Sequence, residues 1–413
     1  MQNLNWRCLR RAIAMATVTV SVVSFTTLAV AQREDASTVR AIFAAAPRVS
    51  TSVKGVTVFA APPQGFNPLT ATNRELLSYG LPQRPDQSVD AKASEHWAKG
   101  MAALQACYQR AGQAVKGPST STAAQACHAS DVTALPYSSL PMVPGNRPAS
   151  ANVDGTTQQS SLNWSGIAQT NKLKSWNDNT SFDEVESVWN VPVANHAFGD
   201  LPCSEGPWWE VTWNGIDGFS NGDVVQGGSS SYWDGGGCKG SISTTGWVEW
   251  APSYPILTID CSSGVACFVS PGDDFWVVTY GTAGTAEQYV FVEDLTQQWS
   301  GTFGLVYQSG PGLVGSSAEY IVERPCCNGS NFYPLGNYVY EFFDYSFAYD
   351  GKGTLFYPGS ASAATQIITM QADEAADYQD ISRPYWYGTA GNQGRYSIWM
   401  ADENCANSGG CAP

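Results

Sequence analysis

Histidine and basic residues are scarce in this chain. Its 413 residues include only 3 His, and 21 Lys and Arg stand against 36 Asp and Glu, a formal net charge of −15 at pH 7. Binding to phosphates requires a basic face, so the charge argues against a nucleic-acid partner. The only His beyond residue 150 is His196, in a turn-like string, and serine or cysteine catalysis therefore lacks a convincing base.

Motifs for metal, nucleotide and acyl-enzyme chemistry are also missing. The sequence has no CxxC pair, no GxSxG string, and no P-loop or dinucleotide fingerprint in a strand-to-helix setting. We therefore expect neither a metal nor a cofactor. Carboxylates and amides are left as the groups that can carry chemistry.

Long apolar runs are missing after about residue 30. Before that point, Arg7, Arg10 and Arg11 precede an uncharged, largely apolar run that ends in small residues around Ala29 and Ala31. This order is typical of a secretory signal peptide that is cut before Gln32, and a retained membrane anchor is the alternative. We predict that residues 1–31 are removed and that the protein is extracellular, without later membrane contact.

Cysteine is plentiful enough for disulfide bonds. Of the 11 Cys, 10 follow the predicted signal peptide, and an even number in an exported chain suggests disulfides. Close spacing favours three pairs, although sequence leaves the connectivity open. These pairs are Cys107–Cys127, Cys261–Cys267 and Cys405–Cys411.

Charge divides the rest of the chain into two regions. Residues 32–158 hold 11 Lys and Arg with 8 Asp and Glu, whereas residues 159–413 hold 7 and 28, so the net charges are +3 and −21. In the first region, apolar side chains at three- and four-residue spacing predict a helix over residues 91–112. A Pro- and Ser-rich stretch over residues 117–161 is typical of a linker that is open to cutting.

The first region is either a small domain of its own or a pro-segment. We favour a pro-segment, because its positive charge complements the acidic region and the linker lies where a processed protein would begin. The predicted organisation is thus a signal peptide at 1–31, a pro-segment with its linker at 32–158, and a main domain at 159–413.

The second region has the pattern of an all-β fold. Short runs rich in Val, Tyr, Trp, Phe and Thr alternate with Gly, Asn, Asp and Ser turns, which suggests a sandwich or barrel. Predicted strands cover residues 184–191, 246–250, 275–280, 289–294, 320–323, 338–347 and 364–370. Its acidic excess favours function in acid, where many carboxylates are protonated, although an acidic surface also serves plain solubility.

Six short strings between Asn163 and Met370, in the same order, resemble the eqolisins, the glutamic peptidases. The strings are Asn163-Trp164-Ser165-Gly166, Trp213-Asn214-Gly215-Ile216-Asp217-Gly218, Val224-Val225-Gln226-Gly227-Gly228, Trp247-Val248-Glu249-Trp250, Gly272-Asp273, and Ala318-Glu319-Tyr320-Ile321-Val322-Glu323. Each is weak alone, but six in order over about 160 residues are a specific signal. Residues 1–158 lie outside the resemblance.

The resemblance implies a sandwich of two large antiparallel sheets, of the concanavalin-like or jelly-roll kind, and an acid endopeptidase. With the pro-segment predicted from charge, this enzyme would be made as a zymogen. The resemblance places the catalytic pair at Gln226 and Glu323 and requires no metal or cofactor. Glu323 would act on water as general base and then as general acid, while the Gln226 amide stabilises the oxyanion. The expected partners are polypeptide substrates and the protein's own pro-segment, and we expect a monomer.

Five further residues are each open to two interpretations. Trp164, Trp213 and Trp247 would line the substrate cleft or simply pack in the core. Asp217 and Glu249 would hold Gln226 or the water through hydrogen bonds, or serve ordinary turn and strand chemistry.

The sequence departs from the family pattern after Glu323. The family has an acidic and then an aromatic residue there, whereas this chain continues with Arg324, Pro325 and two Cys. A cation close to Glu323 would lower the pKa of its carboxyl group and alter the pH optimum. The stretches 193–209 and 232–239 also look longer than is usual in the family, so the shape of the subsites is open.

Two alternatives come from other classes of protein. A β-sandwich glycosidase would use two carboxylates, for example Glu249 and Glu323, with Trp side chains as sugar platforms. A carbohydrate-binding module would use the same aromatic residues without catalysis. Acid cleavage of a denatured protein, release of reducing sugar, and retention on a polysaccharide distinguish the three.

Overall fold

The structure is a computed structural model. It describes residues 33–114, 127–152, 155–194, 207–234, 240–262, 264–282, 287–310, 312–328, 331–338, 340–358, 364–371, 380–387 and 396–402. The predicted signal peptide, His196, and the predicted Cys405–Cys411 pair lie outside these residues. No helix in the described part of the chain is long and apolar enough to cross a membrane.

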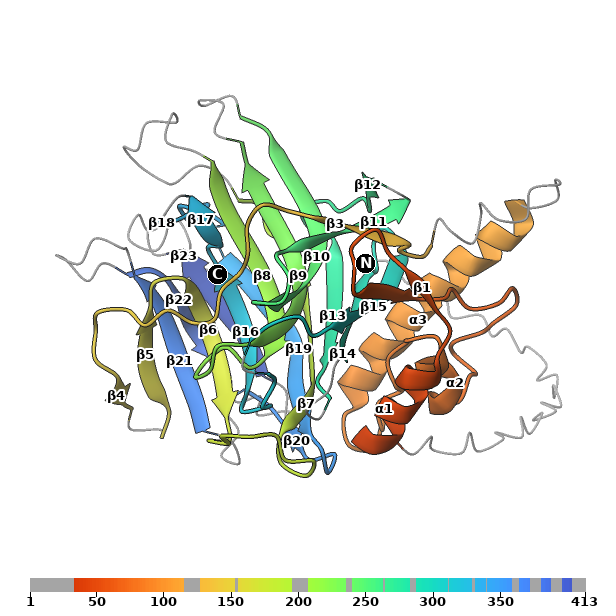
Figure 1. Cartoon of the computed structure of the whole chain (residues 1–413), viewed down its shortest axis with the longest axis horizontal. Coiled ribbons are helices and arrows are strands. Elements are labelled where there is room, and N and C mark those ends of the chain that lie inside the picture. Colours follow the sequence, from red (N-terminus) through yellow and green to blue (C-terminus); the bar gives the residue numbers. More distant parts are fainter. Residues whose placement is uncertain are drawn as a thin grey trace, which may run out of the picture.

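Two large β-sheets, packed face to face, form the body of the protein (Figure 1). The first layer runs in the spatial order β2 (Val56–Phe59), β15 (Trp299–Val306), β14 (Glu287–Asp294), β13 (Asp274–Tyr280), β7 (Phe182–Asn190) and β19 (Tyr340–Asp350), all antiparallel. The second layer runs β3 (Asp131–Ala134), β11 (Leu257–Ser262), β10 (Ile242–Ala251), β9 (Val224–Trp233), β8 (Trp208–Ile216), β16 (Ser317–Glu323), β6 (Trp164–Thr170) and β21 (Ala364–Gln371), with β5 (Thr157–Ser161) parallel beside β21. This architecture confirms the predicted all-β sandwich.

Shorter strands complete the sheets. β22 (Asp380–Tyr387) and β23 (Tyr396–Asp402) connect β21 to β19, so the two layers are continuous along one edge. The remaining strands are β1 (Arg48–Ser50) on β2, β4 (Ser150–Ala151) on β5, β12 (Val265–Ala266) on β11, β20 (Leu355–Phe356) on β19, and the hairpin of β17 (Cys326–Asn328) with β18 (Asn331–Phe332). All seven sequence-predicted strands lie at these positions within a few residues.

Alternation along the strands of the second layer gives it two different faces. Val225, Val248, Tyr320 and Val322 point into the core between the layers, where they join a large apolar cluster. Residues one position away point to the opposite face. A second apolar cluster, built around Trp213, Trp164 and Ile321, covers that face. Residues on β9 and β10 therefore present one set of side chains to the core and another to the outside of the sandwich.

Three helices cover the outer face of the first layer (Figure 1). They are α1 (Ala36–Ala45), α2 (Asn73–Ser78) and α3 (Ala91–Ala114), and α3 confirms the predicted helix. Phe43, Trp97 and Met101 from the helices are buried in one cluster with Trp276 and Phe291 from the sheet. Asp35 caps α1 by accepting from the Thr38 N–H at 2.9 Å, which satisfies a donor that the helix leaves unpaired.

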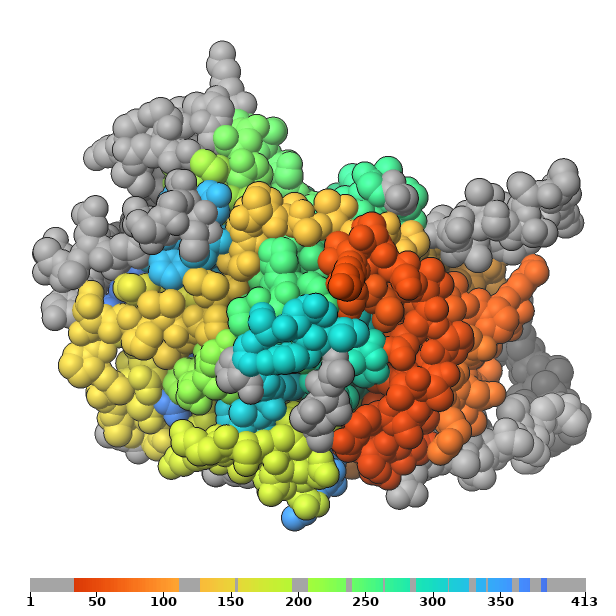
Figure 2. Space-filling view, in the orientation of Figure 1, coloured from red at the N-terminus to blue at the C-terminus, as the bar shows by residue number. Residues whose placement is uncertain are grey.

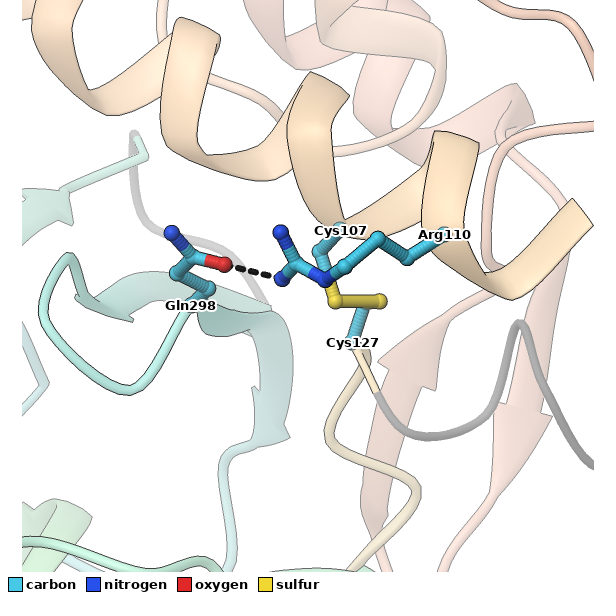
Figure 3. The surroundings of a disulfide bond; sticks show 4 residues. All are labelled: Cys107, Arg110, Cys127 and Gln298. Carbon is cyan, nitrogen blue, oxygen red and sulfur yellow. Dashed lines mark hydrogen bonds between the residues drawn. A yellow bond between two sulfur atoms is a disulfide. The ribbon is translucent and has the colours of Figure 1, made fainter. Parts of the chain in front are cut away.

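Residues 127–143 lead from the helical layer to the other side of the sandwich. A disulfide bond joins Cys107 on α3 to Cys127, and Arg110 donates to the Gln298 side chain in the turn between β14 and β15 (Figure 3). The chain then adds β3 to the edge of β11. The structure contains two of the predicted disulfides, Cys107–Cys127 and Cys261–Cys267.

Candidate active site

Five neighbouring strands of the second layer each place one polar or aromatic side chain on the face away from the core. In spatial order they are Glu249 on β10, Gln226 on β9, Trp213 on β8, Glu323 on β16 and Trp164 on β6. Gln226 lies directly opposite Glu249 on one side and Gly215 on the other. All five side chains are buried. Residues far apart in sequence thus meet because their strands are adjacent.

Glycine at 228 permits the close approach of β9 to β8 beside Gln226. A Cβ atom at Gly228 would lie 2.1 Å from the Thr212 carbonyl oxygen, which is backbone and has no freedom to withdraw. The glycine is therefore a steric requirement of the strand that carries Gln226.

Hydrogen bonds hold the amide and the two carboxylates in place. Gln226 Nε2 donates to Glu249 Oε2 at 2.9 Å. Glu323 Oε2 accepts from the Trp213 indole at 2.9 Å, and Glu323 Oε1 accepts from Asn163 Nδ2 at 3.0 Å. Each group is oriented by at least one side-chain partner, which is how a reactive centre is kept in a fixed geometry.

Burial makes both carboxyl groups hard to ionise in this arrangement. It raises the pKa of Glu323 to about 8, against the lowering effect of its hydrogen-bond donors. Burial, and then the nearby charge of Glu323, raise the pKa of Glu249 well above its usual range. Two buried carboxyl groups that are close enough to repel one another when charged do not both lose their protons readily.

A backbone segment of residues 135–143, hereafter the strap, lies directly across this group. The Leu140 N–H donates to Glu323 Oε1 at 3.1 Å, and the Ser139 N–H donates to Glu249 Oε2 at 3.1 Å. The Leu140 carbonyl accepts from the Trp164 indole at 2.9 Å. The strap thus presents consecutive peptide groups to the two carboxylates, as a bound polypeptide would.

Both sides of the face hold the strap along its length. On one side, the Leu135 N–H donates to the Ile256 carbonyl at 2.9 Å; on the other, Ser138 and Cys326 exchange two backbone hydrogen bonds of 2.8 Å each. The Met142 N–H then donates to the Gly218 carbonyl at 2.9 Å. Figure 2 shows the gold-coloured segment that contains the strap lying over the green strands of the second layer. The Pro- and Ser-rich composition predicts a linker here, whereas residues 135–143 are bound along this face in the structure.

Three of the five predicted supporting residues contact the catalytic pair or the strap. The Trp213 indole donates to Glu323, and the Trp164 indole donates to the strap. Glu249 accepts from Gln226. Trp247 lies on the same face of β10 as Glu249 and is buried in the apolar cluster with Trp213 and Trp164, and its indole N–H has no hydrogen-bond partner among the described residues. Its position is that of a packing residue.

Asp217 does not reach Gln226, contrary to one of its two predicted roles. Its carboxylate accepts from the backbone N–H groups of Val314, Gly315 and Ser316 at 2.5 to 2.8 Å. Asp217 itself has a φ of 71°, in the left-handed region. It fixes the loop that leads into β16, and therefore the position of Glu323 at the other end of that strand.

Arg324 does not lower the pKa of Glu323, because successive residues of an extended chain point to opposite sides. Its guanidinium donates to the carbonyls of Leu162 and Gln371 at 2.6 and 3.2 Å and lies over the Phe332 ring. The departure from the family pattern at this position therefore changes the contacts around Leu162, Gln371 and Phe332, and Arg324 makes no contact with the Glu323 carboxyl group.

Sequence reasoning missed the role of Asn163. This residue opens the first of the six strings and also begins an Asn-x-Ser glycosylation signal. Its side chain is fully buried, donates to Glu323, and accepts from the Val143 N–H at 2.8 Å. The order of the strings was the signal that could have revealed it, since Asn163 stands beside Trp164 in a motif that carries the site.

Among the described residues, no group of three or more His, Cys, Asp or Glu side chains is arranged to hold a metal ion. The chemistry that this face offers is therefore that of an amide, two carboxyl groups, and the indole and amide donors around them. Such a set can bind a peptide group, activate a water molecule and stabilise an oxyanion.

Comparisons with known proteins found one matching family and several similar solved structures. The sequence model of the peptidase A4 family matches residues 162–382. Scytalido-glutamic peptidase, solved with a transition-state analogue inhibitor, is similar at 22% identity over 58% of this chain and 98% of its own, with a TM-score of 0.43. SCP-B, an eqolisin solved with the tripeptide Ala-Ile-His, is similar at 19% identity over 58% and 98%, with a TM-score of 0.41.

Aspergilloglutamic peptidase from Aspergillus niger is similar at 22% identity over 47% of this chain and 99% of its own, with a TM-score of 0.37. No curated protein sequence matches this chain.

Proposed function

This chain belongs to the peptidase A4 family, the eqolisins, and we propose that it is a secreted endopeptidase that works in acid with Gln226 and Glu323 as its catalytic pair. The observation that carries the proposal is that a segment of the chain itself, the strap, binds Glu323 and its neighbour Glu249 through backbone N–H groups. The Leu140 and Ser139 N–H groups bind the Glu323 and Glu249 carboxylates in the way that a substrate backbone would.

The proposed mechanism uses one carboxyl group twice. Ionised Glu323 takes a proton from water, which attacks the peptide carbonyl, and the same proton then goes to the leaving nitrogen. Gln226 Nε2 has a second N–H besides the one that Glu249 accepts, and this N–H donates to the oxyanion. An amide does not titrate, so this stabilisation persists in strong acid.

Burial by the strap also bears on the protonation of Glu323. Burial is the main cause of its raised pKa, so departure of the strap would return water to the carboxyl group and lower that pKa. The strap would therefore hold the catalytic group both covered and protonated. This supports the interpretation of residues 32–158 as a pro-segment.

Charge holds the N-terminal region against the main domain at several points. Among the described residues, five ion pairs join a Lys or Arg from residues 33–147 to an Asp or Glu from residues 178–380. They are Arg33–Glu184, Arg40–Asp178, Arg48–Glu287, Lys99–Asp274 and Arg147–Asp380. Protonation of these carboxylates in acid removes the attraction, while the cations stay charged. Exposed pairs contribute little each, so the buried apolar contacts of the helices supply the remaining affinity.

The Cys107–Cys127 disulfide limits where a single cut in the chain can release the strap. A cut between residues 115 and 126 would leave the strap attached to α3 through Cys107–Cys127 and to the main domain through its own backbone. A cut after the strap would release the helices and the strap as one piece. Residues 146–151 are exposed, and we propose that processing occurs within 144–156.

The test of the catalytic pair starts from the full-length chain, incubated at about pH 3.5 and then assayed on a denatured protein. Glu323→Gln and Gln226→Ala should each leave folded protein with at least about 100-fold less cleavage, since loss of one oxyanion donor costs about 10²–10³ in rate. Glu210→Gln is the matched control, because Glu210 is an equally buried carboxyl on neighbouring β8 that faces the core side.

The outcomes separate the candidate activities. Cleavage that is lost in both site variants and kept in Glu210→Gln supports the proposal. Wild-type cleavage in either site variant refutes the pair, and release of reducing sugar without proteolysis supports the glycosidase alternative.

A further inference from the structure

Beside the candidate catalytic pair, the same face carries a cluster of aromatic residues that the proposed mechanism does not use. Trp209 on β8 and Tyr232 on β9 lie directly opposite one another in the sheet, with ring centroids 4.3 Å apart. Tyr333 approaches from the segment after β18, with its ring centroid 6.0 Å from that of Trp209. We call these three residues the aromatic pocket.

Strand alternation places the aromatic pocket on the catalytic face. Trp209 is four residues from Trp213 on β8, and Tyr232 is six residues from Gln226 on β9, so each pair shares a face. Backbone hydrogen bonds place the Tyr333 segment beside β8 beyond the end of β16, because the Trp209 N–H donates to the Pro334 carbonyl at 3.0 Å. The aromatic pocket therefore lies on the same face of the second layer as Gln226 and Glu323.

The strap fills this pocket with one side chain. The ring of Tyr137 packs against Trp209 with a centroid distance of 4.4 Å and an interplanar angle of 60°, and against Tyr333 at 6.0 Å and 80°. Such edge-to-face contacts stabilise aromatic pairs beyond their burial alone. Burial, and then the phenols of Tyr232 and Tyr333, raise the pKa of Tyr137, which agrees with its enclosure among these rings.

The spacing along the strap matches the spacing along the sheet. Tyr137 is three residues before Leu140, whose N–H binds Glu323, and three extended residues span about 10 Å. Four residues of β8 between Trp209 and Trp213 span about 13 Å. A peptide that touches Glu323 with its backbone therefore reaches the aromatic pocket with the side chain three positions earlier.

We propose that the pocket of Trp209, Tyr232 and Tyr333 is a substrate subsite for a large aromatic side chain, and that Tyr137 of the strap is its occupant before processing. This inference rests on the proposed peptidase function. A substrate that follows the course of the strap places its aromatic residue on the N-terminal side of the cleaved bond, three residues before the residue that donates its nitrogen.

The first test uses acid-processed enzyme and a series of peptides that differ only at that position, with Tyr, Phe, Leu or Ala. Tyr and Phe should exceed Ala by about 10- to 100-fold in kcat/KM, the range expected for burying one large apolar side chain. The gain should lie mainly in KM, because the pocket is remote from the reacting bond. Trp209→Ala should abolish the preference, and Trp209→Phe should restore part of it.

Phe268→Ala, at an exposed Phe, is the control for loss of an aromatic side chain outside the pocket. An unchanged preference in that variant, with loss in Trp209→Ala, supports the subsite. No aromatic preference at this position, or one that survives Trp209→Ala, overturns it.

Trp209 is largely buried, so Trp209→Ala could lose activity by misfolding. A second test therefore uses the wild-type enzyme. A synthetic peptide of residues 135–143 should inhibit the processed enzyme competitively, and the same peptide with Ala in place of Tyr137 should inhibit at least about tenfold more weakly. Equal inhibition overturns the subsite. Absence of any acid proteolysis by the processed chain would instead refute the proposed peptidase function itself, so the two failures are distinguishable.

Discussion

Raising the pH from 4 to 8 should destabilise this protein. Burial raises the pKa of Glu323, Glu210 and Asp294 to about 8 each. Burial also raises the pKa of further carboxyl groups well above their usual range, among them Asp183, Glu186, Glu293, Glu319 and Glu341. Between about pH 4.5 and 8 the folded chain therefore keeps protons that the unfolded chain has lost. Because the folded state binds more protons in this window, the free energy of unfolding falls as the pH rises.

The size of the effect follows from the three groups with a pKa of about 8. A shift of one pKa unit corresponds to about 1.4 kcal/mol, so at pH 7 each of these groups costs about 3–4 kcal/mol relative to pH 4. Three such groups amount to about 10 kcal/mol, similar to the whole stability of an ordinary domain. The exposed side chains of Asp35 and Asp86 have a lowered pKa and act in the opposite sense, but only at lower pH.

Thermal unfolding of full-length Gln226→Ala measures this without self-cleavage. The melting temperature should fall by more than about 10 °C between pH 4 and pH 8, given about 2–4 °C per kcal/mol for a domain of this size. Glu210→Gln should raise the melting temperature at pH 8 and change it little at pH 4, because it removes one buried ionisation. Asp86→Asn should leave the slope unchanged. A melting temperature that is flat or rises over this range would refute the reasoning.

Three further outcomes are expected. Trp213→Phe removes the indole donor to Glu323, so the limb of the pH profile of kcat/KM that belongs to Glu323 should move to higher pH, with about a tenfold loss of rate; an unmoved limb argues against that contact. Gly228→Ala forces a Cβ onto the Thr212 carbonyl and should cost about 3 kcal/mol in urea unfolding, whereas Gly264→Ala, whose Cβ meets nothing, should cost only about 1–2 kcal/mol of left-handed strain. Combined Arg33→Gln and Arg48→Gln removes two ion pairs of the N-terminal region, so acid activation of the precursor should have its midpoint at higher pH; a midpoint that stays or falls contradicts the electrostatic hold.

The sandwich and its helix were predictable because they follow from side-chain patterns. Alternating apolar residues gave the strands, and three- and four-residue spacing gave α3, which the structure extends to Ala114. The ordered strings pointed to Gln226 and Glu323, and strand pairing places both on one face, on β9 and β16 at either side of β8. Close spacing gave the Cys107–Cys127 and Cys261–Cys267 disulfides.

The strap was not predictable, because its key contacts come from the backbone. The N–H groups of Ser139 and Leu140 bind the two carboxylates, and every residue except proline has such a group. Its Pro- and Ser-rich composition resembles that of a linker, and no periodicity marks it as bound. The expected effect of Arg324 on the pKa of Glu323 was wrong for a related reason. Adjacency in sequence does not specify the side of the strand on which a charge lies.

The two faces of the sandwich are coupled through one stretch of chain. Helices on the first layer are held by apolar contacts and ion pairs, while the strap covers the carboxylates on the second layer. The Cys107–Cys127 bond and β3 on the edge of β11 connect these two parts. Weakening the ion pairs alone therefore leaves the strap attached at both of its ends. We propose that a cut beyond Val143 is needed before loosening of the helices also releases the strap, so that acid and proteolysis would both be required to open the site.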